Sequence, residues 1–182
     1  MRIRHSHLLA LAALFASAGN SAVHIAIPWL VLETTGSSAN AGVVLGISGF
    51  SVIFSAPLIG GLIAILGARP VSIWADIISA GSVMLFPIVG SLFGLNLASL
   101  LIIAIVGAIF DPAGATARKS LIQAVAERDG LSLIKFNGTY EAAATIGTVL
   151  GPTGAAVAIS IVGINTTFYL IAIVFILASC LA

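Results

Sequence analysis

The chain has 182 residues; 60% are hydrophobic, only 7% are Asp, Glu, Lys or Arg, and the formal net charge is +1. A typical soluble domain carries about 25% charged residues, so the composition excludes an ordinary soluble protein. It gives no support to nucleic-acid binding, because there is no basic patch beyond a few loop residues. A single cysteine leaves neither a disulfide framework nor a cysteine-based metal site, and no cofactor is expected.

Apolar runs follow one another along the chain, and each is long enough to cross a bilayer. A spanning helix needs about 20 mostly apolar residues, because each residue rises about 1.5 Å and the hydrocarbon is about 30 Å thick. We therefore expect an all-α integral membrane protein, a single bundle of six transmembrane helices over 1–182. The predicted helices are 8–32, 41–66, 71–93, 97–117, 136–162 and 165–182, with a polar loop at 118–135.

The positive residues predict the orientation of this bundle. Lys and Arg favour short cytoplasmic loops, and here they occur only at the N-terminus and in alternate loops. They are Arg2, Arg4, Arg69, Arg118, Lys119, Arg128 and Lys135. We expect a multi-pass protein of the inner or plasma membrane with both termini in the cytoplasm.

The first apolar run has a second interpretation. Residues 1–18 combine a basic start, an apolar stretch and small residues at 16–18, which resembles a cleavable secretory signal. The apolar run continues to Leu32, however, which favours a retained transmembrane helix. An intact mass measurement separates the two.

Polar residues in the first predicted helix lie on one face. Ser17, Asn20, Ser21 and His24 follow i, i+3, i+4, i+7 spacing. Such a stripe lines a water-filled cavity or forms hydrogen bonds to neighbouring helices, and the sequence does not separate these readings. Proton carriage by His24 is the less favoured reading of that residue.

Three carboxylates fall inside predicted helices, where charge is costly and marks functional candidates. Asp76 lies near the cytoplasmic end of its helix, within reach of Arg69, and is interpreted first as a paired structural charge at a gate. Asp111 precedes Pro112, where the helix can bend, and Arg118 follows two turns later on roughly the same face.

The third carboxylate is the favoured proton carrier. Glu141 shares a helical face with Thr145 and Thr148, and this polar stripe is expected to point toward the interior. A buried carboxyl group can hold a proton near neutral pH and release it as a cavity opens to the other side. Glu141 is the first candidate and Asp111 the second.

Small residues and prolines mark the second and fifth predicted helices. Residues 56–61 match 151–156 in a small-Pro-x-x-small-small pattern, and the two helices would run in opposite senses. This favours two inverted three-helix repeats, an arrangement that builds secondary transporters. Gly138, Gly147, Gly151 and Pro152 further predict close helix approach and a compliant bend.

At these residues the chain resembles the major facilitator superfamily, in its drug- and siderophore-exporter-like branch. The string through Gly138, Gly147, Gly151 and Pro152 is similar to that family's antiporter motif, and 17–37, 112–121 and 137–138 resemble other exporter segments. The family's loop between helices 2 and 3 is only partly kept. Gly60, Gly61, Gly67 and Arg69 remain, whereas Ala64, Ile65 and Ala68 replace its charged positions. Asn20 stands where a titratable Asp is frequent.

The resemblance implies a secondary transporter, not an enzyme, that exports a small amphipathic molecule by alternating access, coupled to protons. Its expected partners are the lipid bilayer, the substrate and the proton. Such transporters have two six-helix halves, so 182 residues correspond to the N-terminal half; the chain is a fragment or pairs with a second copy. A non-transporting subunit, a scaffold or an inactive fragment is the alternative.

An intramembrane protease is a further, weak alternative. The segment 46–49 mimics a G-x-S-G serine motif, and a serine nucleophile needs a base within hydrogen-bond reach. All three histidines lie upstream of Ser48. The motif alone therefore does not favour this chemistry.

Overall fold

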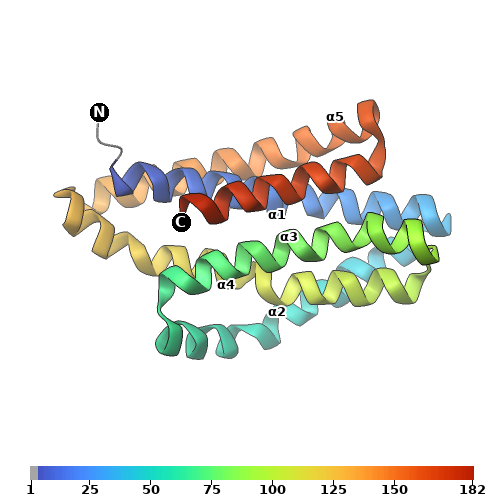
Figure 1. The fold of residues 1–182 in the computed structure, drawn as a ribbon, viewed down its shortest axis with the longest axis horizontal. Helices are drawn as coiled ribbons and strands as arrows, with labels where there is room; N and C mark the ends of the chain where they lie inside the picture. Colours follow the sequence, from blue (N-terminus) through green and yellow to red (C-terminus); the bar gives the residue numbers. More distant parts are fainter. Residues whose placement is uncertain (1–3) are drawn as a thin grey trace.

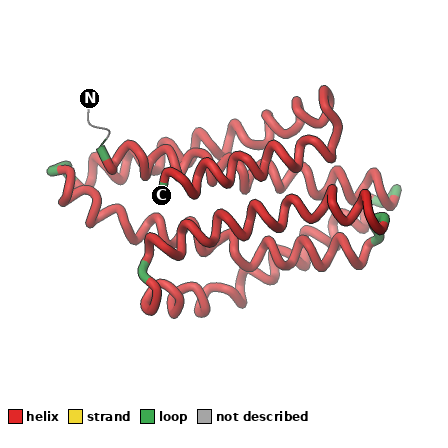
Figure 2. Tube along the Cα trace, in the orientation of Figure 1, coloured by secondary structure: helices red, strands yellow, loops and turns green. Residues whose placement is uncertain are grey.

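The computed structural model describes residues 4–182, apart from the side chains of 51, 52 and 54–56. Within this part of the chain there is no strand, and the all-α prediction is confirmed (Figures 1 and 2). The helices are α1 His5–Thr35, α2 Ser38–Leu66, α3 Ala68–Phe93, α4 Leu97–Asp129 and α5 Leu133–Leu181. Of the described helices, α1, α3, α4 and α5 are each long and apolar enough to cross a membrane.

Helix α5 is two helical arms joined at one glycine. Gly163 has φ 80° and ψ 166°, a conformation that is essentially restricted to glycine. The chain reverses there, so that the second arm (164–181) runs back beside the first arm (133–162) (Figure 1). The junction predicted between 162 and 165 falls at this residue.

The elements run back and forth between two ends of the bundle. The start of α1, the end of α5 and the α2–α3 and α4–α5 junctions lie at left in Figure 1, which we call the terminal end. The α1–α2 and α3–α4 junctions and the reversal at Gly163 lie at the other end, which we call the far end. Charged Arg69, Arg128 and Lys135 therefore belong to terminal-end junctions. Arg2 lies outside the described residues.

The polar loop predicted at 118–135 is wrong over most of its length. Helix α4 continues to Asp129, and α5 begins at Leu133. The extension buries one face, because Ile122 and Ala126 form a cluster with Leu9 of α1 and Phe136 of α5. Hydropathy falls where charged residues begin, but a helix continues as long as one face has a partner to pack against.

The main core joins all five helices, mostly through α1, α3, α4 and the second arm of α5, with Ala41 and Val44 from the start of α2. The rings of Phe86 and Phe168 stack with centroids 4.9 Å apart. A Cβ on Gly19 would lie 3.0 Å from the Phe175 ring, so this glycine lets α1 sit against the second arm. In lipid, such van der Waals contacts replace the hydrophobic effect as the force that joins helices.

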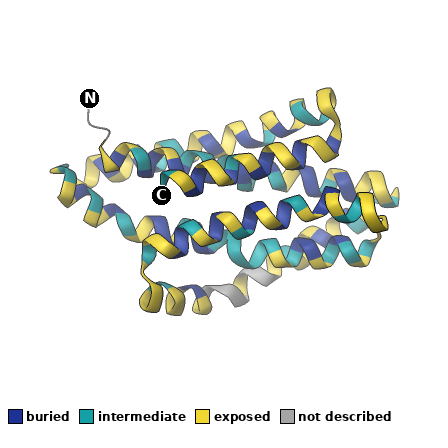
Figure 3. Ribbon diagram, in the orientation of Figure 1, coloured by how far each residue is buried: buried dark blue, intermediate teal, exposed yellow. Residues whose placement is uncertain are grey.

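Helix α2 is the most peripheral element. Its later part lies apart from the other helices, at lower left in Figure 1, and is largely exposed in Figure 3. The exposed fractions of Leu58 and Ile65 are 65% and 82%. This apolar surface requires lipid or another protein surface against it.

Candidate functional site

A cavity of about 450 Å³ lies among α1, α2, α3 and α4. Its volume falls in the range that small-molecule sites occupy. One wall is apolar and includes Val83, Phe86 and Ile103. The polar residues that line it are Asn20, His24, Ser48, Ser79, Ser82 and Asp111.

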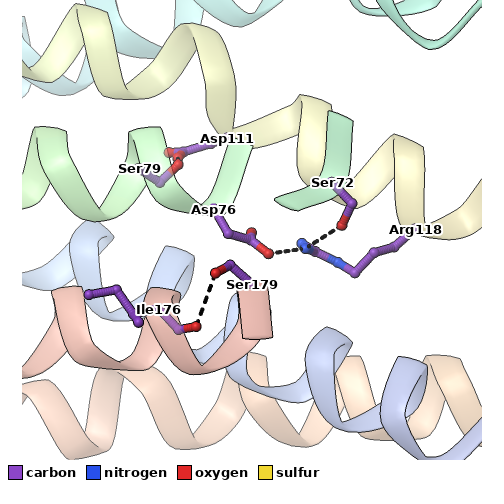
Figure 4. Close-up of polar contacts among 7 residues, drawn as sticks. All are labelled: Ser72, Asp76, Ser79, Asp111, Arg118, Ile176 and Ser179. Carbon is purple, nitrogen blue, oxygen red and sulfur yellow. Dashed lines mark hydrogen bonds and ion pairs between the residues drawn. The ribbon is translucent and has the colours of Figure 1, made fainter. Parts of the chain in front are cut away.

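Asp111 is the carboxylate that lines the cavity. The Ser79 hydroxyl donates a 2.7 Å hydrogen bond to its Oδ1, which joins α3 to α4 (Figure 4). Pro112, the next residue in α4, also lines the cavity and has no backbone N–H to donate. Asp111 therefore sits at a point in α4 where the helical hydrogen bonding is interrupted.

A buried ion pair lies about 10 Å further along α4, toward the terminal end. Arg118 Nη1 donates to Asp76 Oδ2 at 2.6 Å and to Ser72 Oγ at 3.2 Å. Both charged side chains are almost fully buried, with exposed fractions of 3% for Arg118 and 4% for Asp76. Figure 4 shows Asp76 and Arg118 pointing toward one another from α3 and α4.

One expected ion-pair partner is corrected by this geometry. Asp76 pairs with Arg118, not with Arg69, whose Nε instead donates to the carbonyl of Ala182 at 3.2 Å. Although Arg118 and Asp111 lie on roughly the same face of α4, they do not pair. The reason is that Arg118 and Asp76 meet at the same depth of the α3–α4 contact, whereas Asp111 lies two turns away along α4.

Gly114 makes room for the buried pair. A Cβ at this position would lie 3.2 Å from both Asp76 Oδ1 and Arg118 Nη2. Arg118 Nε, although buried, has no hydrogen-bond partner among the described residues. The pair is therefore tightly enclosed but not fully hydrogen bonded.

The predicted polar stripe of α1 divides in two. Asn20 and His24 line the cavity, whereas Ser17 and Ser21 do not. The Asn20 Oδ1 atom is buried and has no hydrogen-bond partner within the described part of the chain. A buried amide oxygen left unpaired is costly, so it provides a site for a donor that enters the cavity.

Glu141 does not face the interior of this bundle. Its Oε1 lies 2.9 Å from Lys119 Nζ, and the exposed fractions of the two side chains are 45% and 57%. Thr145 and Thr148, on the same face, are exposed as well. The first arm of α5 instead buries the face that carries Gly147, Gly151 and Ala155, which the stripe of polar residues alone did not indicate.

The glycines of the fifth predicted helix differ in their surroundings. A Cβ on Gly147 would collide with the carbonyl oxygen of Leu14, and one on Gly151 with that of Ala18. These contacts are between backbones, so the close approach predicted from the spacing is present here. Gly138 has nothing within 4 Å of its Cβ position, and Pro152 is half-buried.

The glycines near the α2–α3 junction have open surroundings. A Cβ on Gly60 or Gly61 would contact nothing, and Gly67 has φ 86° at the turn between the helices. Among the matched residues 56–61, the side chain of Ala56 lies outside the described residues. Close packing is therefore seen in only one of the two matched segments.

Ser48 of the serine-like segment lines the same cavity as His24 and Asp111. Its buried hydroxyl nevertheless has no hydrogen-bond partner among the described residues, so His24 does not activate it. The geometry favours Ser48 as a polar wall residue.

Sequence reasoning missed the serines of α3. Ser72, Asp76 and Ser79 follow i, i+4, i+7 spacing on α3, the same signal that was used for α1. Ser79 and Ser82 line the cavity, whereas Ser72 accepts a hydrogen bond from Arg118. The signal was present in the sequence, but on this helix only the carboxylate was singled out.

Comparisons with known proteins find similarity along almost the whole chain. A family model described as Major Facilitator Superfamily matches residues 9–182. The chain is 38% identical over 163 residues to the multidrug efflux pump Tap of Mycolicibacterium fortuitum, covering 87% of this chain and 40% of that protein. It is 34% identical over 171 residues to the multidrug efflux pump Tap of Mycobacterium tuberculosis, covering 92% and 41%. The chain thus spans about two fifths of the length of these relatives. No solved structure matches it.

Proposed function

We propose that this chain, which belongs to the major facilitator superfamily, is a six-span half of a proton-coupled transporter that exports small amphipathic molecules. Membership in the family and the efflux pumps among its relatives support transport as the function and a multi-pass membrane location. Substrate type, proton coupling and alternating access are the finer proposals. The observation that carries them is a cavity with the carboxylate of Asp111 in its wall.

The proposed topology has six crossings with both ends in the cytoplasm. The two arms of α5 count as separate crossings because the chain reverses at Gly163 (Figure 1). Cations at the terminal-end junctions support placing that end in the cytoplasm. Two inverted three-helix repeats remain part of the proposal, supported by the matched proline positions Pro57 and Pro152 inside α2 and α5.

Asp111 is the proposed proton carrier. A carboxylate in a largely apolar cavity binds either a proton or a positively charged group, and these compete for one site. The Ser79 hydroxyl holds the carboxylate in place, and Asn20 and His24 line the same cavity. Protonation from outside then releases the bound molecule, which couples inward proton movement to export.

Alternating access needs a bundle that moves against a partner. The backbone contact at Gly147 and Gly151 fixes α5 to α1, whereas Pro152 provides a bend just beyond it. The buried Asp76–Arg118 pair ties α3 to α4 near the terminal end and would hold that side shut. The exposed apolar faces of α2 and α5 are the proposed contact for a second six-helix half or a second copy of the chain.

A transport assay in sealed vesicles tests the proposal. Asp111→Asn is expected to abolish proton-driven movement of an amphipathic dye, while Glu141→Gln, which removes an exposed carboxylate outside the cavity, retains it. Both variants should be matched for amount in the membrane. Transport by Asp111→Asn equal to that of the unsubstituted protein would contradict the assignment of Asp111. If the unsubstituted protein transports no dye, the result would favour a non-transporting subunit.

A further inference from the structure

A second recess lies at the far end of the bundle, apart from the cavity. It has a volume of about 560 Å³ and lies between α1 and the end of the first arm of α5. It shares no lining residue with the cavity that holds Asp111. Its walls include Trp29, Leu32 and Glu33 of α1 and Ile159 and Ser160 of α5.

The recess exists because α1 and α5 diverge. Their backbones touch at Gly147 and Gly151, and beyond that crossing the two helices separate toward the far end (Figure 1). The first arm then ends at Gly163, which also lines the recess. The recess is therefore a consequence of the crossing of α1 and α5.

Among the described residues, Glu33 is the sole charged one that lines this recess. Arg2 lies outside the described residues; every other Lys and Arg belongs to the start of α1, the α2–α3 junction or the region 118–135, all toward the terminal end. Glu33 takes part in neither of the two ion pairs found among the described residues. The far end therefore presents one carboxylate with no cation of the described chain beside it.

Trp29 lies one turn before Glu33 on the same face of α1. It is 52% exposed and lines the same recess. The face of an aromatic ring attracts a cation, and the indole of Trp does so more strongly than the rings of Tyr and Phe. Leu32 and Ile159 add apolar wall, which suits the body of a molecule that carries a positive centre.

We propose that this recess is a second binding site, which takes an organic cation with apolar substituents, such as a quaternary ammonium or phosphonium ion. Glu33 supplies the opposite charge and Trp29 the aromatic face. This proposal rests on the proposed function in one respect, the orientation that places the recess at the outer side of the membrane. Binding itself is tested without transport, so the two can fail separately.

The experiment uses Trp29 as its own reporter. The chain has two tryptophans, so Trp74→Phe leaves Trp29 as the only one. In nanodiscs of zwitterionic phosphatidylcholine, tetraphenylphosphonium is expected to change the Trp29 emission in a saturable manner. Glu33→Gln should weaken this binding about fivefold, the upper range for a partly exposed charge pair. Tetraphenylborate, of the same shape and opposite charge, should give no saturable change.

A control variant locates the signal. Glu127→Gln removes an exposed carboxylate at the terminal end and should leave the binding curve unchanged. The proposal is overturned if Glu33→Gln binds like its parent, if Glu127→Gln weakens binding as much as Glu33→Gln does, if tetraphenylborate saturates equally, or if the response is linear throughout. Equilibrium dialysis of labelled tetraphenylphosphonium repeats the comparison without fluorescence.

Discussion

At the scale of single residues, the charges inside the bundle sort into two kinds. Asp76 and Arg118 neutralise one another and are enclosed, whereas Asp111 lines a cavity and accepts a hydrogen bond from Ser79. Burying two opposite charges gains little net stability, but leaving one of them alone is expensive. We therefore expect the Asp76–Arg118 pair to act on stability, whereas Asp111 is the carboxylate that we propose as the proton carrier.

This difference predicts a pattern of stabilities. Arg118→Met leaves Asp76 as an uncompensated buried charge and should lower the free energy of unfolding by about 3–5 kcal/mol. The double variant Asp76→Leu/Arg118→Met removes both charges and should recover most of that loss. Reversible unfolding in mixed micelles gives the free energy of unfolding of the unsubstituted protein, the single variant and the double variant. A double variant less stable than Arg118→Met would contradict the reading of this pair.

At the scale of elements, the contact between α1 and α5 depends on two glycines. A Cβ on Gly151 would collide with the Ala18 carbonyl, and backbone yields less easily than a side chain. Gly151→Ala is therefore expected to destabilise by about 1–3 kcal/mol, the usual cost of overpacking. Gly154→Ala, three residues away with open space around it, is the matched control and should be close to neutral. Thermal unfolding of both variants gives the comparison.

The reversal within α5 gives a second prediction at this scale. Gly163 has a positive φ that an L-residue with a Cβ adopts only with strain. Gly163→Ala should cost about 1–3 kcal/mol of stability although its Cβ would meet no neighbouring atom. Gly138→Ala, in a regular part of the same helix, serves as control. Equal stability of the two variants would show that the chain does not reverse at residue 163.

The elements also show where sequence reasoning succeeds. Apolar length predicted where the long helices lie, because this signal is local. The extent of α4 was missed because residues 118–129 pack against α1 and α5, which lie far away in sequence. Glu141 was assigned to the interior because its helical face is polar, whereas backbone contact with α1 determines which face of α5 is buried.

The site was predicted only in part, for the same reason. Asn20, His24 and Asp111 were found from the cost of placing polar groups in a membrane. The relative depth of α3 and α4 in the bundle determines which side chains meet. It brings Ser79 to Asp111 and Arg118 to Asp76. This depth is set by packing between helices, and it cannot be derived from the residues of either helix alone.

At the scale of the whole molecule, a large part of the surface is apolar and without a protein contact. Leu58 and Ile65 of α2 and Val149 of α5 are 65%, 82% and 63% exposed. We expect a second six-helix half or a second copy to cover part of this surface. Crosslinking through Leu58→Cys, in a Cys180→Ala background, should trap a dimer of the chain alone in membranes if a second copy is the partner. Only monomer in the intact membrane would exclude that partner.

The central claim is that the chain crosses the membrane six times with its cavity between the crossings. The direct test is the side from which single cysteines react with a membrane-impermeant reagent, again in a Cys180→Ala background. Thr34→Cys, next to the α1–α2 junction, is predicted to react from outside intact cells, and Arg69→Cys, next to the α2–α3 junction, only after the cells are opened. Reaction of both positions from the same side would contradict the account.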